Sequence, residues 1–106
     1  MRGAMPSEIF DASNRPRYEV RVRAKAFLWG SDKITSDLIF DRPLILHIRN
    51  DAVGVDMDIA LLSAGGTTTS VGALRPGECV SVPIQQIIAV LATCTGETLA
   101  GCIITS

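Results

Sequence analysis

Two stretches of the chain alternate between apolar and polar side chains, the first of them strictly. In residues 17–25 (RYEVRVRAK) every odd position is charged and the even positions carry Tyr, Val, Val and Ala. Residues 53–62 (VGVDMDIALL) repeat the pattern, with Asp56 and Asp58 on the polar side. Because successive side chains of a β-strand point to opposite faces, both stretches are predicted to be strands with one buried face.

The other apolar stretches are short and are separated by residues that favour turns. Aromatic residues make up only 5% of a chain that is 47% hydrophobic, so the core is predicted to consist of Val, Ile, Leu and Ala. Val and Ile favour strands, and here they outweigh a competing helical period in PIQQIIAVLA. The predicted strands span residues 17–28, 34–40, 44–49, 53–62, 79–84, 87–94 and 99–105.

The segments between the later strands carry specific turn signals. In RPGE (75–78), Pro76 presets its φ and Gly77 accepts a positive φ, as a type II turn requires. TGET (95–98) is predicted to be a hairpin loop. AGGTTTSVG (64–72) lacks the lysine and the following helix of a phosphate loop. It is predicted to be a mobile hairpin loop or a sheet edge, whose small hydroxyl side chains could form a flat contact surface.

This pattern predicts an all-β fold in residues 17–106. We expect a single β-sandwich of about seven to eight short antiparallel strands, immunoglobulin-like or jelly-roll, with a small closed barrel as the alternative. Residues 1–16 contain glycine, proline and a turn-like DASNRPR stretch, and are predicted to form an extended N-terminal arm. Ile9 and Phe10 are the apolar exceptions in this arm, and we expect them to pack on the domain itself or on a neighbouring subunit.

The basic residues are concentrated near the N-terminus, although the formal net charge is only −1. The rest of the chain leans acidic, and such an asymmetry often marks a segment that docks on a partner. Alternatively, the charges neutralise each other within the fold, with Asp56 and Asp58 as cross-strand partners of the basic strand. The sequence leaves both interpretations open. The candidate protein-interaction residues are Ile9, Phe10, Arg15, Arg17, Arg21, Arg23 and Lys25.

No recognisable catalytic or metal-binding motif accompanies this surface. His47 is the single histidine, and no G-x-S-x-G nucleophile motif exists with which it could form a triad. Cys79, Cys94 and Cys102 lack the C-x2–4-C spacing of structural zinc sites. The odd number of cysteines and the absence of a secretory signal predict free thiols in a reducing cytoplasm. Cys94 and Cys102 flank the predicted hairpin and could pair only in an oxidising environment. We therefore expect a protein that is not an enzyme and binds no metal or cofactor.

Other classes of partner have less support. No aromatic side chain alternates with the basic residues of 17–25, which argues against a nucleic-acid-binding β domain that uses this strand. No apolar run approaches the roughly 18 residues needed to cross a bilayer, so a membrane partner is not expected. A carbohydrate-binding sandwich is the first alternative, with Trp29 and Tyr18 as its stacking platform.

Residues 74–104, LRPGECVSVPIQQIIAVLATC followed by LAGCIIT, resemble the C-terminal halves of small β-rich proteins of tailed phages. These are the capsid decoration (cement) proteins and related virion-surface proteins. The resemblance implies a non-enzymatic structural protein that binds an assembled protein shell, such as the major capsid protein. It also implies a homo-oligomer, possibly a trimer, that is made in the cytoplasm of a bacterial host and located on the virion.

Overall fold

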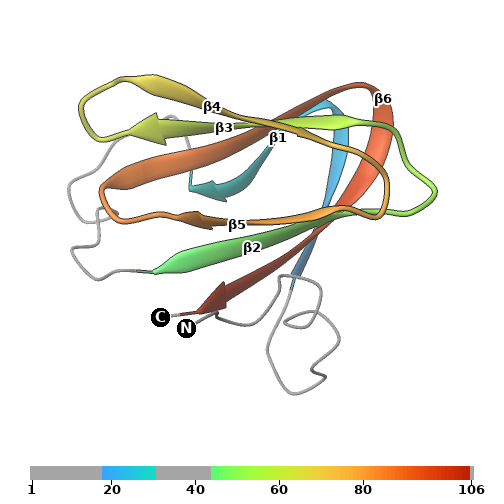
Figure 1. The fold of residues 1–106 in the computed structure, drawn as a ribbon. Helices are drawn as coiled ribbons and strands as arrows, with labels where there is room; N and C mark the ends of the chain where they lie inside the picture. Colours follow the sequence, from blue (N-terminus) through green and yellow to red (C-terminus); the bar gives the residue numbers. More distant parts are fainter. Residues whose placement is uncertain (1–17, 31–43, 106) are drawn as a thin grey trace.

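The computed structural model describes residues 18–30 and 44–105, and these ranges contain strands and no helix (Figure 1). The prediction of an all-β fold is therefore confirmed. The arm at 1–16 and the predicted strand at 34–40 lie outside the described residues. The strands are β1 (Tyr18–Gly30), β2 (Ile45–Asn50), β3 (Met57–Ser63), β4 (Thr68–Leu74), β5 (Cys79–Pro83) and β6 (Ile87–Thr105).

The long strand β6 organises the sheet. β1 pairs antiparallel with β6 along one side, on both halves of its length. On the other side, β3 pairs with the first half of β6 and β2 pairs with the second half. β4 and β5 then extend the sheet from β3 and β2, respectively. The described strands thus form one six-stranded, hydrogen-bonded sheet.

The sheet curls into a half-barrel because β1 and β6 bend at the same place. In β6, residues 94–96 are inserted between Thr93 and Glu97, whereas β1 has the single residue Ala24 between their partners. A bulge of this kind bends both strands and allows them to pass from one layer into the next. The half that contains β3 and β4 then faces the half that contains β2 and β5 (Figure 1).

This bend corrects the predicted hairpin at 95–98. These residues lie within the continuous strand β6, which runs through the bend and pairs with β1 before and after it. Cys94 and Cys102 therefore belong to the same strand and are not cross-strand neighbours; the residue opposite Cys102 on β1 is Tyr18. The described residues form six strands in a single sheet, so neither the predicted strand count nor the separate sheets of a sandwich are confirmed.

The two alternating stretches have the predicted buried faces only in part. Val22, Met57 and Ile59 are buried, and their polar neighbours Arg21 and Asp58 are exposed. Three residues predicted to face inward are nevertheless exposed: Tyr18, Ala24, which lies in the bulge, and Val53, which precedes β3. The strand predicted at 53–62 begins only at Met57. The predicted turn at 75–78 is present, with Gly77 at φ +87° and the Glu78 N–H donating to the Arg75 carbonyl at 3.0 Å. The core is aliphatic as expected, and its fully buried larger side chains include Leu28, Leu46, Ile48, Met57, Ile59, Ile84 and Val90.

A buried polar network ties the ends of several strands together. Asn50 is fully buried at the end of β2, and its Nδ2 donates to the carbonyls of Val55 at 2.8 Å and Leu74 at 2.9 Å. Its Oδ1 accepts from the Thr98 hydroxyl at 2.6 Å. All the hydrogen-bonding groups of this amide are thus satisfied, which a buried amide requires. The network also explains Gly54, because a Cβ there would lie 1.8 Å from the Thr98 Oγ1.

Replacing Asn50 by Ala is expected to destabilise the fold strongly. The substitution removes the hydrogen bonds of Asn50 to the Val55 and Leu74 carbonyls and to the Thr98 hydroxyl, the last two of which are buried. We expect a loss of about 3 kcal/mol in the free energy of unfolding. Thr98→Val, which removes one of the three bonds, should have a smaller effect. Urea unfolding of both variants tests this order, and an Asn50→Ala loss below that of Thr98→Val would contradict it.

Tyr18 connects the two halves of β1 across the bend. Its hydroxyl donates to the Leu28 carbonyl, ten residues further along the same strand, at 2.6 Å. Burial raises the pKa of the Tyr18 hydroxyl, and the neighbouring Cys102 raises it further. Burial also raises the pKa of the Cys102 thiol to about 12, although its hydrogen bond with Tyr18 acts in the opposite direction. Both groups therefore hold their protons more tightly in the folded chain.

The raised pKa values of Tyr18 and Cys102 predict that the folded chain loses stability at alkaline pH. As the pH rises above the ordinary thiol pKa of 9.0, the unfolded chain loses its Cys102 proton first, so the free energy of unfolding falls until the folded thiol ionises near 12. Below pH 8 these groups contribute no pH dependence. Cys102→Ala should reduce the decline between pH 9 and 11, as measured by urea unfolding across this range. An identical decline in the variant would rule out the thiol as its source.

Candidate interaction surface

The edge strand β4 is the most accessible strand of the sheet. Every residue from Thr68 to Ala73 is exposed, and only Leu74 at its end reaches the core, where it is 7% exposed. The exposed residues include no charged side chain and no proline. One side of β4 pairs with β3, and no described strand pairs with the other side. An edge of this kind presents unpaired backbone N–H and C=O groups to solvent.

The sequence before β4 explains why it forms a strand rather than a loose loop. Ser63 and Thr67 close a turn, with the Ser63 N–H donating to the Thr67 carbonyl at 2.9 Å and the Thr67 N–H donating to Ser63 Oγ at 3.1 Å. Gly66 supplies the positive φ, at +90°. The β-branched run that follows favours an extended chain. Of the two predictions for 64–72, the sheet edge is therefore correct for the residues from Thr68 onward.

The other described edges carry features that discourage pairing. β5 is only five residues long and ends at Pro83, which has no N–H to donate. β1 carries Arg21, Arg23 and Lys25, and its pairing with β6 is interrupted by two register shifts. Charge, proline, short length and bulges are the usual means by which proteins protect sheet edges. Among the described strands, β4 alone has an edge without charge or proline, although its pairing with β3 shifts register at Val71.

Arg21 and Arg23, two of the candidate protein-interaction residues, share one carboxylate within the fold. Glu97 lies opposite Arg23 on β6, and its Oε1 lies 3.2 Å from Arg23 Nε. Its Oε2 pairs with Arg21 Nη1. All three side chains are at least 43% exposed, so the ion pairs are solvated and contribute little stability. The internal neutralisation that the sequence left open is thus real in part, with Glu97 as the partner.

Asp56 and Asp58 do not serve as these cross-strand partners. Asp58 lies opposite Thr93 on β6 and Ala73 on β4, so the whole width of β6 separates it from β1. Lys25 is exposed and lies beyond the bend, apart from the Glu97 pairs. The remaining candidate residues lie outside the described part of the chain and stay predictions; they are Ile9, Phe10, Arg15 and Arg17.

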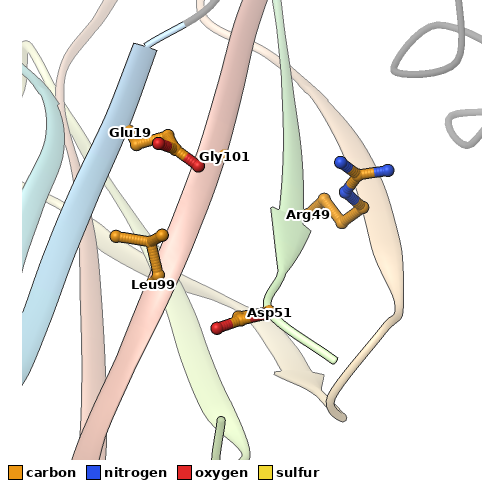
Figure 2. Close-up of a pocket in the computed structure, with 5 residues that line it drawn as sticks. All are labelled: Glu19, Arg49, Asp51, Leu99 and Gly101. Atoms are coloured by element: carbon orange, nitrogen blue, oxygen red, sulfur yellow. The ribbon is translucent and has the colours of Figure 1, made fainter. Parts of the chain in front are cut away.

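A shallow groove crosses the outside of the sheet near the end of β2. It has a volume of about 70 Å³ and is lined by Glu19, Arg49, Asp51, Leu99 and Gly101 (Figure 2). Gly101 leaves a gap in the row of side chains, and the Glu19 carboxylate reaches over β6 toward it (Figure 2). A second hollow of about 270 Å³ adjoins it at Arg49 and Asp51. Both are smaller than the roughly 300–1,000 Å³ typical of small-molecule sites.

The reactive side chains of the described residues are held in structural contacts. His47 is 6% exposed, with Nδ1 2.7 Å from Ser81 Oγ and Nε2 2.8 Å from Thr105 Oγ1. The Cys94 thiol donates to the Val22 and Gly96 carbonyls at 3.5 and 3.3 Å. In residues 18–30 and 44–105, no group of three or more His, Cys, Asp or Glu side chains could hold a metal ion. No helix in those ranges could span a membrane.

The aromatic platform considered for carbohydrate binding is not assembled by the described strands. Trp29 is partly buried and packs against the core. The Tyr18 hydroxyl is used in the bond to the Leu28 carbonyl at the other end of the same strand. A stacking site needs aromatic faces that are exposed side by side, so this arrangement argues against the carbohydrate-binding alternative.

Comparisons with known proteins add one likeness in fold. No protein-family model and no curated protein sequence matches the chain. A solved structure of a Bacillus endospore appendage, from a family described as disulfide-linked pili, is similar with a TM-score of 0.54 and 15% sequence identity. The likeness covers 86% of this chain and 81% of the appendage chain. It shows a shared β fold.

Reversing the charge of Arg21 and Arg23 tests whether they act in the ion pairs with Glu97 or in docking on a partner. In Arg21→Glu/Arg23→Glu, Glu97 faces two carboxylates, and we expect the free energy of unfolding to fall by about 1 kcal/mol because like charges repel across the strands. Adding Glu97→Arg should restore most of the loss. Lys25→Glu, which lies beyond the bend, is the matched control and should change stability less.

Urea unfolding measures these differences, and sedimentation velocity of the same variants reports on assembly. If the double reversal abolishes self-association while stability is unchanged, the arginines act in docking rather than in the internal pairs.

Proposed function

We propose that this chain is a non-enzymatic structural protein that assembles with further copies of itself. The observation that carries the proposal is the exposed, uncharged edge of β4. Proteins that remain monomeric protect long sheet edges, because unpaired backbone groups recruit strands from other chains. Pairing of an added strand with an exposed sheet edge is a recurrent way to build protein contacts.

The fold likeness supports the same class of function. The similar solved structure is of an endospore appendage from a family of disulfide-linked pili. A repeated subunit of an appendage needs a rigid scaffold and surfaces that other copies recognise. The curled sheet with its satisfied buried polar groups supplies the scaffold, since none of the described buried side-chain N or O atoms lacks a hydrogen-bond partner.

The narrower role of a phage capsid decoration protein has less support. The pattern in residues 74–104 that suggested it included a hairpin at 95–98, where the described chain instead continues as β6. The solved structure that is similar in fold is of a pilus rather than of a capsid protein. We therefore favour self-assembly into a multi-subunit structure over binding to a preformed virion shell.

We also infer that the curled sheet is a jelly-roll type of sandwich. β1 and β6 each run through both halves of the curled sheet. One half also contains β3 and β4, and the other also contains β2 and β5. Strands that switch layers at a bend are a known route to packed sheets with a common core. An experimental structure of the full chain tests this topology.

Self-association of the purified full chain tests the proposed function. We expect sedimentation velocity to show species larger than a monomer whose proportion rises with protein concentration. Negative-stain electron microscopy of the same samples should show assemblies of repeating subunits. A chain that stays strictly monomeric at the highest soluble concentration, without repeating assemblies, would contradict the proposal.

A further inference from the structure

The half of the curled sheet that contains β3 and β4 has apolar side chains on its outward face. Asp58 of β3 is exposed, and because side chains alternate between the two faces of a strand, Ala60 and Leu62 lie on the same side as Asp58. The register places Leu91 of β6 opposite Ala60, and Phe27 of β1 opposite Leu91. Phe27, Leu91 and Ala60 therefore form one row across three strands, with Leu62 beside it.

These four side chains lie outside the hydrophobic core. The core cluster and the side chains packed against it take the alternate positions of the same strands, for example Ala26, Ile59 and Val90. Within residues 18–30 and 44–105, the other half of the sheet faces only the inward side of this half (Figure 1). We call the four partly exposed side chains the outward patch; they are Phe27, Ala60, Leu62 and Leu91. Contiguous apolar groups rimmed by polar residues are typical of interaction sites.

The rim of the outward patch is basic on its β1 side. The next row toward the bend consists of Lys25, Thr93 and Asp58, from β1 through β6 to β3. Arg23 precedes Lys25 on the outward face of β1, and both side chains are exposed. Glu97 is shared between Arg23 and a second arginine, so it neutralises only part of this charge. A ligand that covers Phe27 and Leu91 from the β1 side is therefore expected to be apolar with acidic neighbours.

The N-terminal segment of the chain has this composition. Ile9 and Phe10 are adjacent large apolar residues, and Glu8 and Asp11 flank them on both sides. Residues 3–14 contain no basic residue. Ile9 and Phe10 are the residues for which the sequence left open a contact with the domain itself or with a neighbouring subunit. The outward patch gives such a contact a receptor of matching size and opposite charge.

We propose that Ile9 and Phe10 of one copy of the chain dock on the outward patch of a second copy, with Glu8 and Asp11 on the side of Lys25. The inference rests on the proposed function, because it names a contact between the assembling copies. Residues 11–17 span about 23 Å when extended, which is enough to carry the apolar pair from the start of β1 to an adjacent copy. The contact joins two different surfaces, so it can repeat from copy to copy without closing after two.

Two variants test the contact, because each removes one of its two sides. Ile9→Ser/Phe10→Ser removes the docking side chains and keeps the patch, whereas Leu91→Ser removes the centre of the patch and keeps the segment. Each variant alone should self-associate about tenfold more weakly than the wild-type chain in sedimentation velocity. Their equimolar mixture should form one-to-one complexes, because the intact segment of the second variant docks on the intact patch of the first.

Val53→Ser is the matched control, because Val53 is 88% exposed and lies outside the outward patch. It should leave association unchanged, and thermal unfolding by circular dichroism verifies that each variant is folded.

The outcomes distinguish this inference from the proposed function. If the wild-type chain assembles and neither variant weakens it, another surface carries assembly; the proposed function stands and the docking is wrong. If both variants lose thermal stability and their mixture does not associate, the segment packs on its own domain, which overturns docking on a second copy. A monomeric wild-type chain overturns both.

Photocrosslinking gives an independent readout that keeps the patch intact. With p-benzoylphenylalanine in place of Phe10, irradiation of the associating chain should link this position to peptides that contain Phe27 or Leu91. Mixing ¹⁵N-labelled with unlabelled chains shows by mass spectrometry whether a link joins two copies. Links between labelled and unlabelled copies are expected. Links confined to single copies, or to peptides away from the outward patch, would overturn the docking even if Leu91→Ser fails to fold.

Discussion

The pairing of β6 with strands on both of its sides is the constraint on which the rest of the structure depends. β1 follows one side of β6 before and after the bend, while β3 and β2 divide the other side between them. β4 and β5 are attached only through β3 and β2. The register of β6 therefore determines which side chains of the five other described strands face the core, directly for β1, β2 and β3 and through one neighbour for β4 and β5.

The bend shared by β1 and β6 has a local cost in β1, which is offset mainly by the core. Ala24 adopts φ +61°, and a left-handed conformation costs a residue other than glycine about 1–2 kcal/mol. Inside the bend, the Cys94 thiol donates to the Val22 carbonyl. Outside it, Glu97 holds Arg21 and Arg23. The core that forms between the two halves then supplies the main stabilisation, because it buries apolar side chains from all six described strands, with Leu74 as the contribution of β4.

The charged and uncharged edges of the sheet differ in a way that bears on function. The basic residues of β1 made it the candidate docking strand in the sequence. Two of its arginines, however, form ion pairs with Glu97, and its edge is charged and irregular. β4 carries no conspicuous motif, yet its edge is exposed and uncharged, with one register shift at Val71. Its only sequence signal was a run of Thr and Ser after Gly65–Gly66, which is equally typical of a loop. Edge position cannot be read from such a run, because it depends on which strands pair elsewhere.

The sequence by itself determined the all-β class, the aliphatic core, the burial of Val22, Met57 and Ile59 within the alternating stretches, and the turn at 75–78. These follow from local periodicity and from the φ preferences of Pro76 and Gly77, which act within a few residues. Only the tertiary structure decided that residues 95–98 bend a continuous strand instead of reversing it. Thr-Gly-Glu-Thr permits both conformations, and the choice depends on β1, which supplies hydrogen-bond partners on both sides of the bend from more than 60 residues away. The same long-range pairing left β4 at an edge.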